Sequence, residues 1–174
     1  AVAGPMGLLG IHRKTHLSPP EKAVYRAGEE IRVFSWDSTV FGVLLCYEAH
    51  FPELATLTAL AGAHILFVPH ASPGDDADGK FRSWMRHLPA RAFDNGLYVA
   101  VSNQAGKANE GFQFPGVAII LGPDGRLLNR YAGGDEFILY GEIDKDVLKE
   151  VRGHRMKYYI PFRRPELYKA LLRR

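Results

Sequence analysis

The chain has 174 residues, of which 47% are hydrophobic, 11% aromatic and 24% charged, with a formal net charge of +3. This composition is typical of one globular domain and excludes a disordered, collagen-like or coiled-coil chain. All apolar runs are far shorter than the roughly 18 residues of a membrane helix, so we expect no membrane partner. A single cysteine, Cys46, cannot form an internal disulfide, and a reducing, cytoplasmic location is expected.

Charge divides the chain into a body, residues 1–150, and a basic tail, residues 151–174. The tail holds eight Lys or Arg residues against Glu166 alone, a balance of +7, whereas the body carries 14 minus 18, or −4. Aromatic residues interleaved with these cations could stack on bases and bind RNA. Because the body has the opposite sign, we prefer an interpretation without nucleic acid, in which the tail docks on the body or on a second copy in a homo-oligomer.

The first half of the chain predicts two strands around a loop and then a strand, helix and strand unit. The expected elements are strands over residues 8–13, 31–36 and 39–45, a helix over 52–61 and a strand over 64–68. Ser18-Pro19-Pro20 interrupts regular structure in the loop, which carries Glu21. Pro52 suits the first turn of the helix and Gly62 its end. Cys46 therefore lies between a buried strand and a helix.

The second half repeats the alternation of helix and strand and then adds antiparallel strands. The expected elements are a helix over residues 81–92, strands over 97–102, 116–121, 126–131 and 137–143, and a helix over 144–151. Pro89 should kink or interrupt the first of these helices. Gly122-Pro123-Asp124-Gly125 is typical of a hairpin turn. The whole pattern predicts an α/β fold.

Cys46 and Lys14 are the candidate catalytic residues. A cysteine is an effective nucleophile as the thiolate, and its pKa falls beside a helix N-terminus and near a cation. Cys46 meets the first condition by position, and Lys14, at the end of a predicted strand, is the candidate cation. The alternatives are a buried, inert cysteine and a solvated surface lysine.

The sequence around both residues resembles the nitrilase superfamily of carbon–nitrogen hydrolases. The resemblance begins with Arg-Lys-Thr-His-Leu at 13–17 and Cys-Tyr-Glu-Ala-His-Phe-Pro-Glu at 46–53. It continues at residues 61–63, 68–69, 90–95, 102–104, 114–116, 122–125 and 163–168. The spacing from Lys14 to Cys46 is specific, and the similarity covers essentially the whole chain.

The resemblance implies a Glu, Lys, Cys triad acting on amides, N-carbamoyl compounds or nitriles. Cys46 would attack the carbonyl carbon and form a thioester, and Lys14, with the backbone N–H of Tyr47, would stabilise the oxyanion. Glu21 matches a second family glutamate that positions substrate or water, although it could equally be a solvated carboxylate. The remaining candidates, expected first to orient strands and second to bind substrate, are Glu48, Arg91 and Asn103.

The resemblance also implies an α-β-β-α four-layer sandwich whose first catalytic glutamate precedes the lysine. Residues 1–13 contain no acid, and the roughly eight predicted strands are too few for two packed sheets. We therefore expect the C-terminal two thirds of such a fold, with N-terminal strands missing. A segment carrying the glutamate would then be a partner, and without it an apolar sheet face would be exposed.

Three other functions compete with amide hydrolysis. Nitrile hydrolysis is the nearest, although tryptophan is commoner than tyrosine after the cysteine in nitrilases proper. A non-catalytic fragment or subunit with an inert Cys46 is the second. The third, a Ser/His/Asp hydrolase, lacks a Gly-x-Ser-x-Gly motif. His12 and His16 have no acid close enough in sequence to complete a metal site, and no phosphate or dinucleotide motif occurs, so no metal or cofactor is expected.

Overall fold

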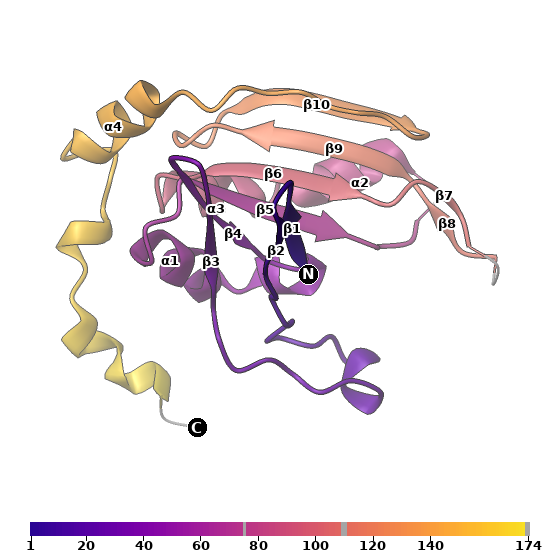
Figure 1. Ribbon diagram of the computed structural model, residues 1–174, viewed down its shortest axis with the longest axis horizontal. Coiled ribbons are helices and arrows are strands. Elements are labelled where there is room, and N and C mark those ends of the chain that lie inside the picture. Colours follow the sequence, from indigo (N-terminus) through magenta and orange to yellow (C-terminus); the bar gives the residue numbers. More distant parts are fainter. Residues whose placement is uncertain (75, 109–110, 173–174) are drawn as a thin grey trace.

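A computed structural model describes residues 1–74, 76–108 and 111–172. Its centre is a six-stranded mixed sheet (Figure 1). In spatial order the strands are β10 (Leu127–Gly134), β9 (Gly116–Leu121), β6 (Tyr98–Asn103), β5 (Ile65–His70), β4 (Thr39–Val43) and β3 (Val33–Trp36). Two short hairpins complete the strands, β1 (Val2–Gly4) with β2 (Gly7–Gly10) and β7 (Gly106–Lys107) with β8 (Gln113–Phe114).

Strands β4, β5 and β6 are parallel, and the other neighbours in the sheet are antiparallel. Helices connect the parallel strands, as a return to the same edge of a sheet requires. The helices are α1 (Pro52–Leu60), α2 (Ala77–Trp84), α3 (Leu88–Phe93) and α4 (Lys145–Gly153). Among the described residues none of these helices is long and apolar enough to cross a membrane. The predicted mixed α/β class is confirmed by this arrangement.

The main core lies between the sheet and helices α1, α2 and α3. Its strand residues point to one face of the sheet and its helix residues close over them. The fully buried members from the strands include Leu66, Val99, Ile119 and Leu121. On the opposite face, α4 covers only one end, where Leu148 packs against Ile65 and Tyr98.

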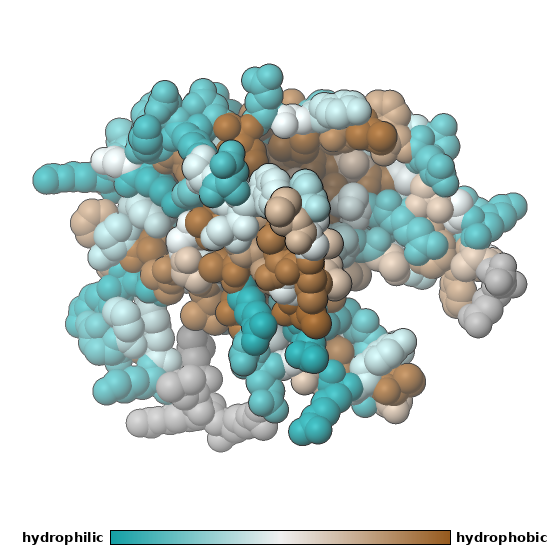
Figure 2. All heavy atoms as spheres, in the orientation of Figure 1, coloured by the Kyte–Doolittle hydropathy of each residue, from teal (hydrophilic) through white to brown (hydrophobic). Residues whose placement is uncertain are grey.

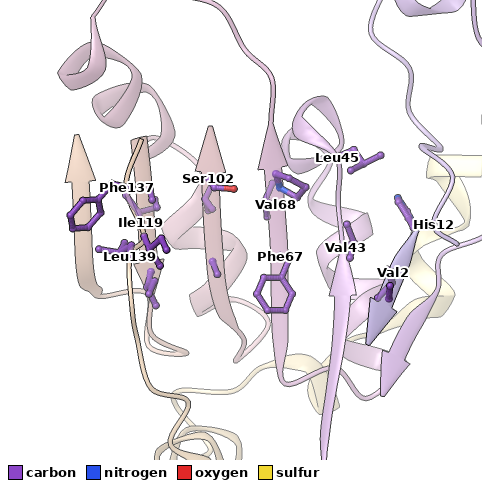
Figure 3. A pocket seen from close by; sticks show the side chains of 18 residues that line it. Val2, His12, Val43, Leu45, Phe67, Val68, Ser102, Ile119, Phe137 and Leu139 are labelled. Atoms are coloured by element: carbon purple, nitrogen blue, oxygen red, sulfur yellow. The ribbon is translucent and has the colours of Figure 1, made fainter. Parts of the chain in front are cut away.

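The rest of that second face, which we call the open face, is apolar and hollowed. Alternate strand residues such as Phe67, Ala100 and Ile120 line a hollow of about 680 Å³ together with Val2 and Phe137 (Figure 3). Phe67 keeps 40% of its surface exposed although it lies on a central strand. Figure 2 shows hydrophobic residues gathered around this middle part of the molecule. An exposed apolar sheet face was expected from the sequence.

The interruption predicted at Pro89 is confirmed, because the helical stretch is divided into α2 and α3 and Pro89 lies in the first turn of α3. The helical stretch begins at Ala77, before the predicted start at residue 81. The strand predicted over 137–143 does not form. Residues 137–143 instead form a loop. Phe137, Ile138 and Leu139 line the hollow of the open face, and the Asn129 side chain donates a hydrogen bond to the carbonyl of Tyr140 (3.0 Å). Hydrophobic alternation cannot create a strand without a backbone partner.

The C-terminal segment after α4 consists of loops and two 3₁₀ turns, η3 (Ile160–Phe162) and η4 (Pro165–Leu172). Arg152, at the end of α4, donates hydrogen bonds to the carbonyls of Gly96 (3.0 Å) and Ala63. Further along, Arg163 and Tyr168 line a groove with Glu53 of α1. The first part of this segment therefore contacts the body of the same chain, where Tyr159 lies beside Phe93, and most described side chains after Ile160 are exposed.

Candidate active site

Cys46 occupies a sharp turn directly after β4. It is the first residue of the 3₁₀ turn η2 (Cys46–His50), which leads into α1 at Pro52. Its φ angle is +49°, in the left-handed region that non-glycine residues seldom adopt. Such strained residues concentrate at functional sites, where the surrounding structure holds them in place. Arg91 helps to hold this turn, since its guanidinium donates to the carbonyls of Ala49 (2.9 Å) and His50 (3.0 Å).

Lys14 and Glu21 form a close ion pair beside the nucleophile. Lys14 lies in the irregular segment after β2, which ends at Gly10, and not on the strand predicted over residues 8–13. Its Nζ lies 2.7 and 2.6 Å from the two carboxylate oxygens of Glu21, which belongs to the 3₁₀ turn η1 (Glu21–Ala23). The backbone N–H and hydroxyl of Ser18 also donate to Glu21, each at 2.7 Å. The hydrogen bond from Lys14, opposed by burial and aided by Ser18, lowers the Glu21 pKa to about 2.

Both charges act on the Cys46 thiol. Burial, the largest influence, raises the pKa of this thiol; the Lys14 ammonium lowers it and the Glu21 carboxylate raises it. Lys80 and a backbone hydrogen bond from Ala71 lower the pKa as well, yet the net direction is upward. The sequence expectation of a lowered thiol pKa is therefore wrong for this chain, because burial outweighs the ammonium and the turn.

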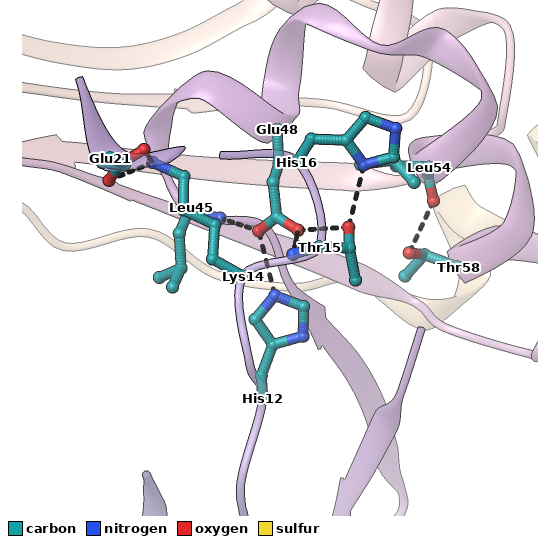
Figure 4. A network of polar contacts seen from close by, with 9 residues as sticks. All are labelled: His12, Lys14, Thr15, His16, Glu21, Leu45, Glu48, Leu54 and Thr58. Atoms are coloured by element: carbon teal, nitrogen blue, oxygen red, sulfur yellow. Dashed lines mark hydrogen bonds and ion pairs between the residues drawn. The ribbon is translucent and has the colours of Figure 1, made fainter. Parts of the chain in front are cut away.

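Glu48 lies two residues beyond the nucleophile and is completely buried (Figure 4). One carboxylate oxygen accepts from the backbone N–H (2.8 Å) and hydroxyl (2.7 Å) of Thr15. The other accepts from the backbone N–H of Leu45 (2.7 Å) and lies 2.9 Å from Nε2 of His12. Burial raises the pKa of Glu48, but the hydrogen bonds from His12, Leu45 and Thr15 lower it further, so the carboxylate stays ionised.

Asn103, at the end of β6, positions the loop that contacts the thiol. Its amide oxygen accepts from the backbone N–H of Ser72 (3.0 Å). Its amide nitrogen donates to the carbonyls of Ser72 (3.1 Å) and Pro115 (2.9 Å). Lys80 of α2 donates to the Ser72 hydroxyl at 2.7 Å. The loop is thereby fixed where Ala71 meets Cys46, and Asn103 uses both its donors for this purpose.

Tyr47, the residue after the nucleophile, is half-buried. Its ring packs at 5.4 Å from that of Phe51 and at 5.9 Å from that of His50. The ring of His16 also packs against Phe51, with the two ring centroids 4.2 Å apart. These contacts join the turn after β4 to the segment that carries Lys14.

The sequence analysis did not identify Thr15 or Lys80 as site residues. It considered His12 only as a possible metal ligand. Thr15 and His12 lie close to Lys14 in the chain, so the sequence does show that they are near a candidate catalytic residue. Their partner, Glu48, lies 33 to 36 residues away in sequence, which no local pattern reveals. Among the described residues no group of three or more His, Cys, Asp or Glu side chains is arranged to hold a metal ion.

The sequence of this chain is similar to a known protein family. The family model for "Carbon-nitrogen hydrolase" matches residues 3–153. The chain is 38% identical over 168 residues to a "Hydrolase in pqqF 5'region" of Pseudomonas protegens, covering 94% of this chain and 55% of that protein. It is 34% identical over 179 residues to N-carbamoylputrescine amidase of Solanum tuberosum, covering 94% of this chain and 59% of that enzyme.

A solved structure shares the fold. The crystal structure of a carbon–nitrogen hydrolase from Helicobacter pylori G27 superposes with a TM-score of 0.84 at 28% identity, covering 95% of this chain and 62% of that one. The chain thus spans a little over half the length of the proteins that it matches.

Proposed function

Because the chain belongs to the carbon–nitrogen hydrolase family, we propose that it hydrolyses a small amide or N-carbamoyl compound through a thioester on Cys46. The observation that supports this most strongly is the position of Lys14, whose charge acts on the Cys46 thiol from a partly buried ion pair with Glu21. A cation next to a strained cysteine suits the stabilisation of an oxyanion formed on that cysteine.

The proposed reaction has two halves. The Cys46 sulfur attacks the carbonyl carbon as its proton passes to a base, and Lys14 with the Tyr47 backbone N–H stabilises the oxyanion. The C–N bond then breaks, the nitrogen leaves as ammonia or an amine with that proton, and a thioester remains. Water next attacks the thioester, the base takes the water proton, and the carboxylic acid leaves with Cys46 restored. Glu21 would hold Lys14 and the substrate in position.

In this proposal the base is a carboxylate on a further polypeptide segment, because neither Glu21 nor Glu48, the two carboxylates that the described part of the chain places at the site, suits the role. Because the thiol pKa is raised, most of the thiol is protonated at neutral pH, and efficient attack on an unactivated amide needs a base. Glu21, with a pKa of about 2, is too weak a base for a thiol, and Glu48 has both oxygens occupied by donors. A polypeptide segment that brings the base would also cover the open face, whose hollow is apolar.

The proposal also includes a homo-oligomeric assembly and a cytoplasmic location. The C-terminal segment exposes Phe162, Leu167 and Tyr168, which suits contact with a second copy in a homo-oligomer. A single free thiol suits a reducing, cytoplasmic location.

The second candidate is a non-catalytic subunit with an inert thiol. The raised pKa of Cys46 is the observation that favours it, because a buried, protonated thiol reacts slowly. The two proposed functions predict different reactions with an acyl donor: the hydrolase should be acylated on Cys46, and the non-catalytic subunit should not.

The deciding experiment uses p-nitrophenyl butyrate, whose leaving group departs without a proton. The enzyme hypothesis predicts a burst of p-nitrophenolate and one butyryl group on Cys46, detected by intact mass and peptide mapping. Slow release of this group follows if the base is missing. Cys46→Ser should show no burst, and Cys46 itself should stay unmodified if the chain is an inert subunit. Equal acylation of wild type and Cys46→Ser, all of it on surface lysines, would reject the proposal.

A further inference from the structure

His12, Thr15 and Leu45 converge on the carboxylate of Glu48, and we call these four residues the Glu48 clamp. The carboxylate has no exposed surface and accepts from four donors, two on each oxygen (Figure 4). A carboxylate offers about four acceptor positions, so its hydrogen-bonding capacity is filled. An amide or a smaller side chain could not accept all four bonds.

The clamp joins the two segments that carry the candidate catalytic groups. His12 and Thr15 lie on either side of Lys14 in the chain, and Leu45 immediately precedes Cys46. One carboxylate therefore holds both flanks of the lysine and the residue before the cysteine. The backbone of Leu45 and Thr15 could bind other acceptors, but the side chain of His12 has a single donor directed at Glu48 (2.9 Å).

The hydrogen bond to Glu48 indicates which ring nitrogen of His12 is the donor. Since an ionised carboxylate only accepts, the ring must donate through Nε2, and a neutral ring then carries a lone pair on Nδ1. In the part of the chain that the structure describes, Nδ1 has no partner and no exposed surface. A buried polar atom without a partner destabilises a protein. The side chain of His12 therefore makes one buried hydrogen bond, to Glu48, and leaves its other ring nitrogen unpaired.

We infer that His12 is a positioning residue, which acts through Glu48 to hold the Lys14 ammonium close to the Cys46 sulfur. This inference rests on the proposed roles of Lys14 and Cys46 but not on turnover. It requires that loss of the His12 donor loosens the segment around Lys14. The cation then stabilises the thiolate less, and the thiol pKa rises further.

The test measures the alkylation of Cys46 by iodoacetamide as a function of pH in the complete chain, because the rate follows the thiolate fraction. His12→Leu removes the donor at similar volume, whereas His12→Gln keeps an N–H where Nε2 lies. We expect His12→Leu to move the midpoint upward by about half a pH unit, on the order of a threefold slower reaction at fixed pH. His12→Gln should restore most of the difference, and His154→Leu, at an exposed histidine, should have no effect.

A double-mutant cycle with Lys14→Met separates positioning from general loosening. Lys14→Met alone should raise the midpoint, and His12→Leu should add nothing further in that background. An unchanged midpoint in His12→Leu with a lower melting temperature would make His12 merely structural and overturn the inference. A full additional shift in the Lys14→Met background would overturn it too.

Two controls keep the outcome decisive. If His12→Leu does not fold, Thr15→Val is the alternative variant, because it removes one hydrogen bond to the other oxygen of Glu48. It should raise the midpoint of the alkylation profile by a smaller amount. An unchanged midpoint would count against the inference. Failure of p-nitrophenyl butyrate to acylate Cys46, with the alkylation shifts intact, would reject the proposed function and leave the role of His12 standing.

Discussion

The turn after β4 and the loop after Lys14 each present one carboxylate near the nucleophile, in opposite surroundings. Glu48 in the turn is fully buried, and its partners are two backbone N–H groups and two short, fixed side chains. Glu21 in the loop keeps 30% of its side chain exposed, and its main partner is the end of a flexible lysine. Both have a lowered pKa, through different donors.

This difference separates a structural carboxylate from one that can exchange partners. Glu48 cannot turn toward a substrate without leaving buried donors unpaired, which costs free energy at each of them. Glu21 can release Lys14 toward an oxyanion and still be solvated, because water reaches it. Substitution of Glu48 should therefore have its largest effect on stability, and substitution in the loop that holds Lys14 and Glu21 should have its largest effect on reactivity.

The largest effect is expected for Glu48→Ala. Removing the carboxylate leaves the donors of His12, Thr15 and Leu45 buried without an acceptor, and loss of one partner of a buried pair costs roughly 3 to 5 kcal/mol. Urea denaturation should show this loss in the free energy of unfolding. Glu150→Ala, at an exposed residue, is the matched control and should change it by less than about 0.5 kcal/mol. A loss below about 1 kcal/mol for Glu48→Ala would remove the distinction between the two regions.

Lys14→Met should have the next largest effect, on reactivity. Loss of oxyanion stabilisation should slow the acylation of Cys46 by p-nitrophenyl butyrate by at least about 10²-fold, equivalent to about 2.7 kcal/mol. Lys22→Met, at an exposed lysine of the same loop, should leave this rate unchanged. A stopped-flow measurement of the burst checks both variants. Equal acylation rates for Lys14→Met and wild type would show that Lys14 is a solvated surface lysine with no part in the reaction.

A smaller change of opposite sign is expected for Glu21→Gln. The Glu21 carboxylate raises the pKa of the Cys46 thiol, so its neutralisation should lower that pKa. The iodoacetamide profile should therefore move to lower pH, by less than about one unit because the carboxylate is partly solvated. Glu29→Gln, an exposed neighbour, provides the control. An upward shift would mean that Glu21 acts mainly by holding Lys14 in position.

The smallest effect is the acid dependence of stability. In the folded chain the Glu21 pKa is about 2, against an ordinary value of 4.5, so the ionised form is favoured by folding. Its contribution is complete above about pH 4.5 and is lost as pH falls towards 2. Partial exposure limits it to less than about 1 kcal/mol. The stability difference between wild type and Glu21→Gln should therefore shrink between pH 5 and pH 3 in urea titrations; a constant difference would contradict the pKa.

Much of the architecture followed from local sequence. Pro52 begins α1, Gly122 to Gly125 form the turn between β9 and β10, and Cys46 lies between a buried strand and the helix that follows. Each of these depends on backbone preferences of residues close together in the chain. The strand predicted over residues 137–143 was wrong, because a strand also needs a hydrogen-bonded partner, which local sequence does not reveal.

The sequence by itself therefore determined the α/β class, the family resemblance and the two candidate groups, Cys46 and Lys14. Only the tertiary structure decided the direction of the thiol pKa and the partners of Glu48. The physical reason is that burial and hydrogen bonding depend on which distant segments meet. His12 and Glu48 are 36 residues apart in sequence, and nothing near either residue encodes the contact between them.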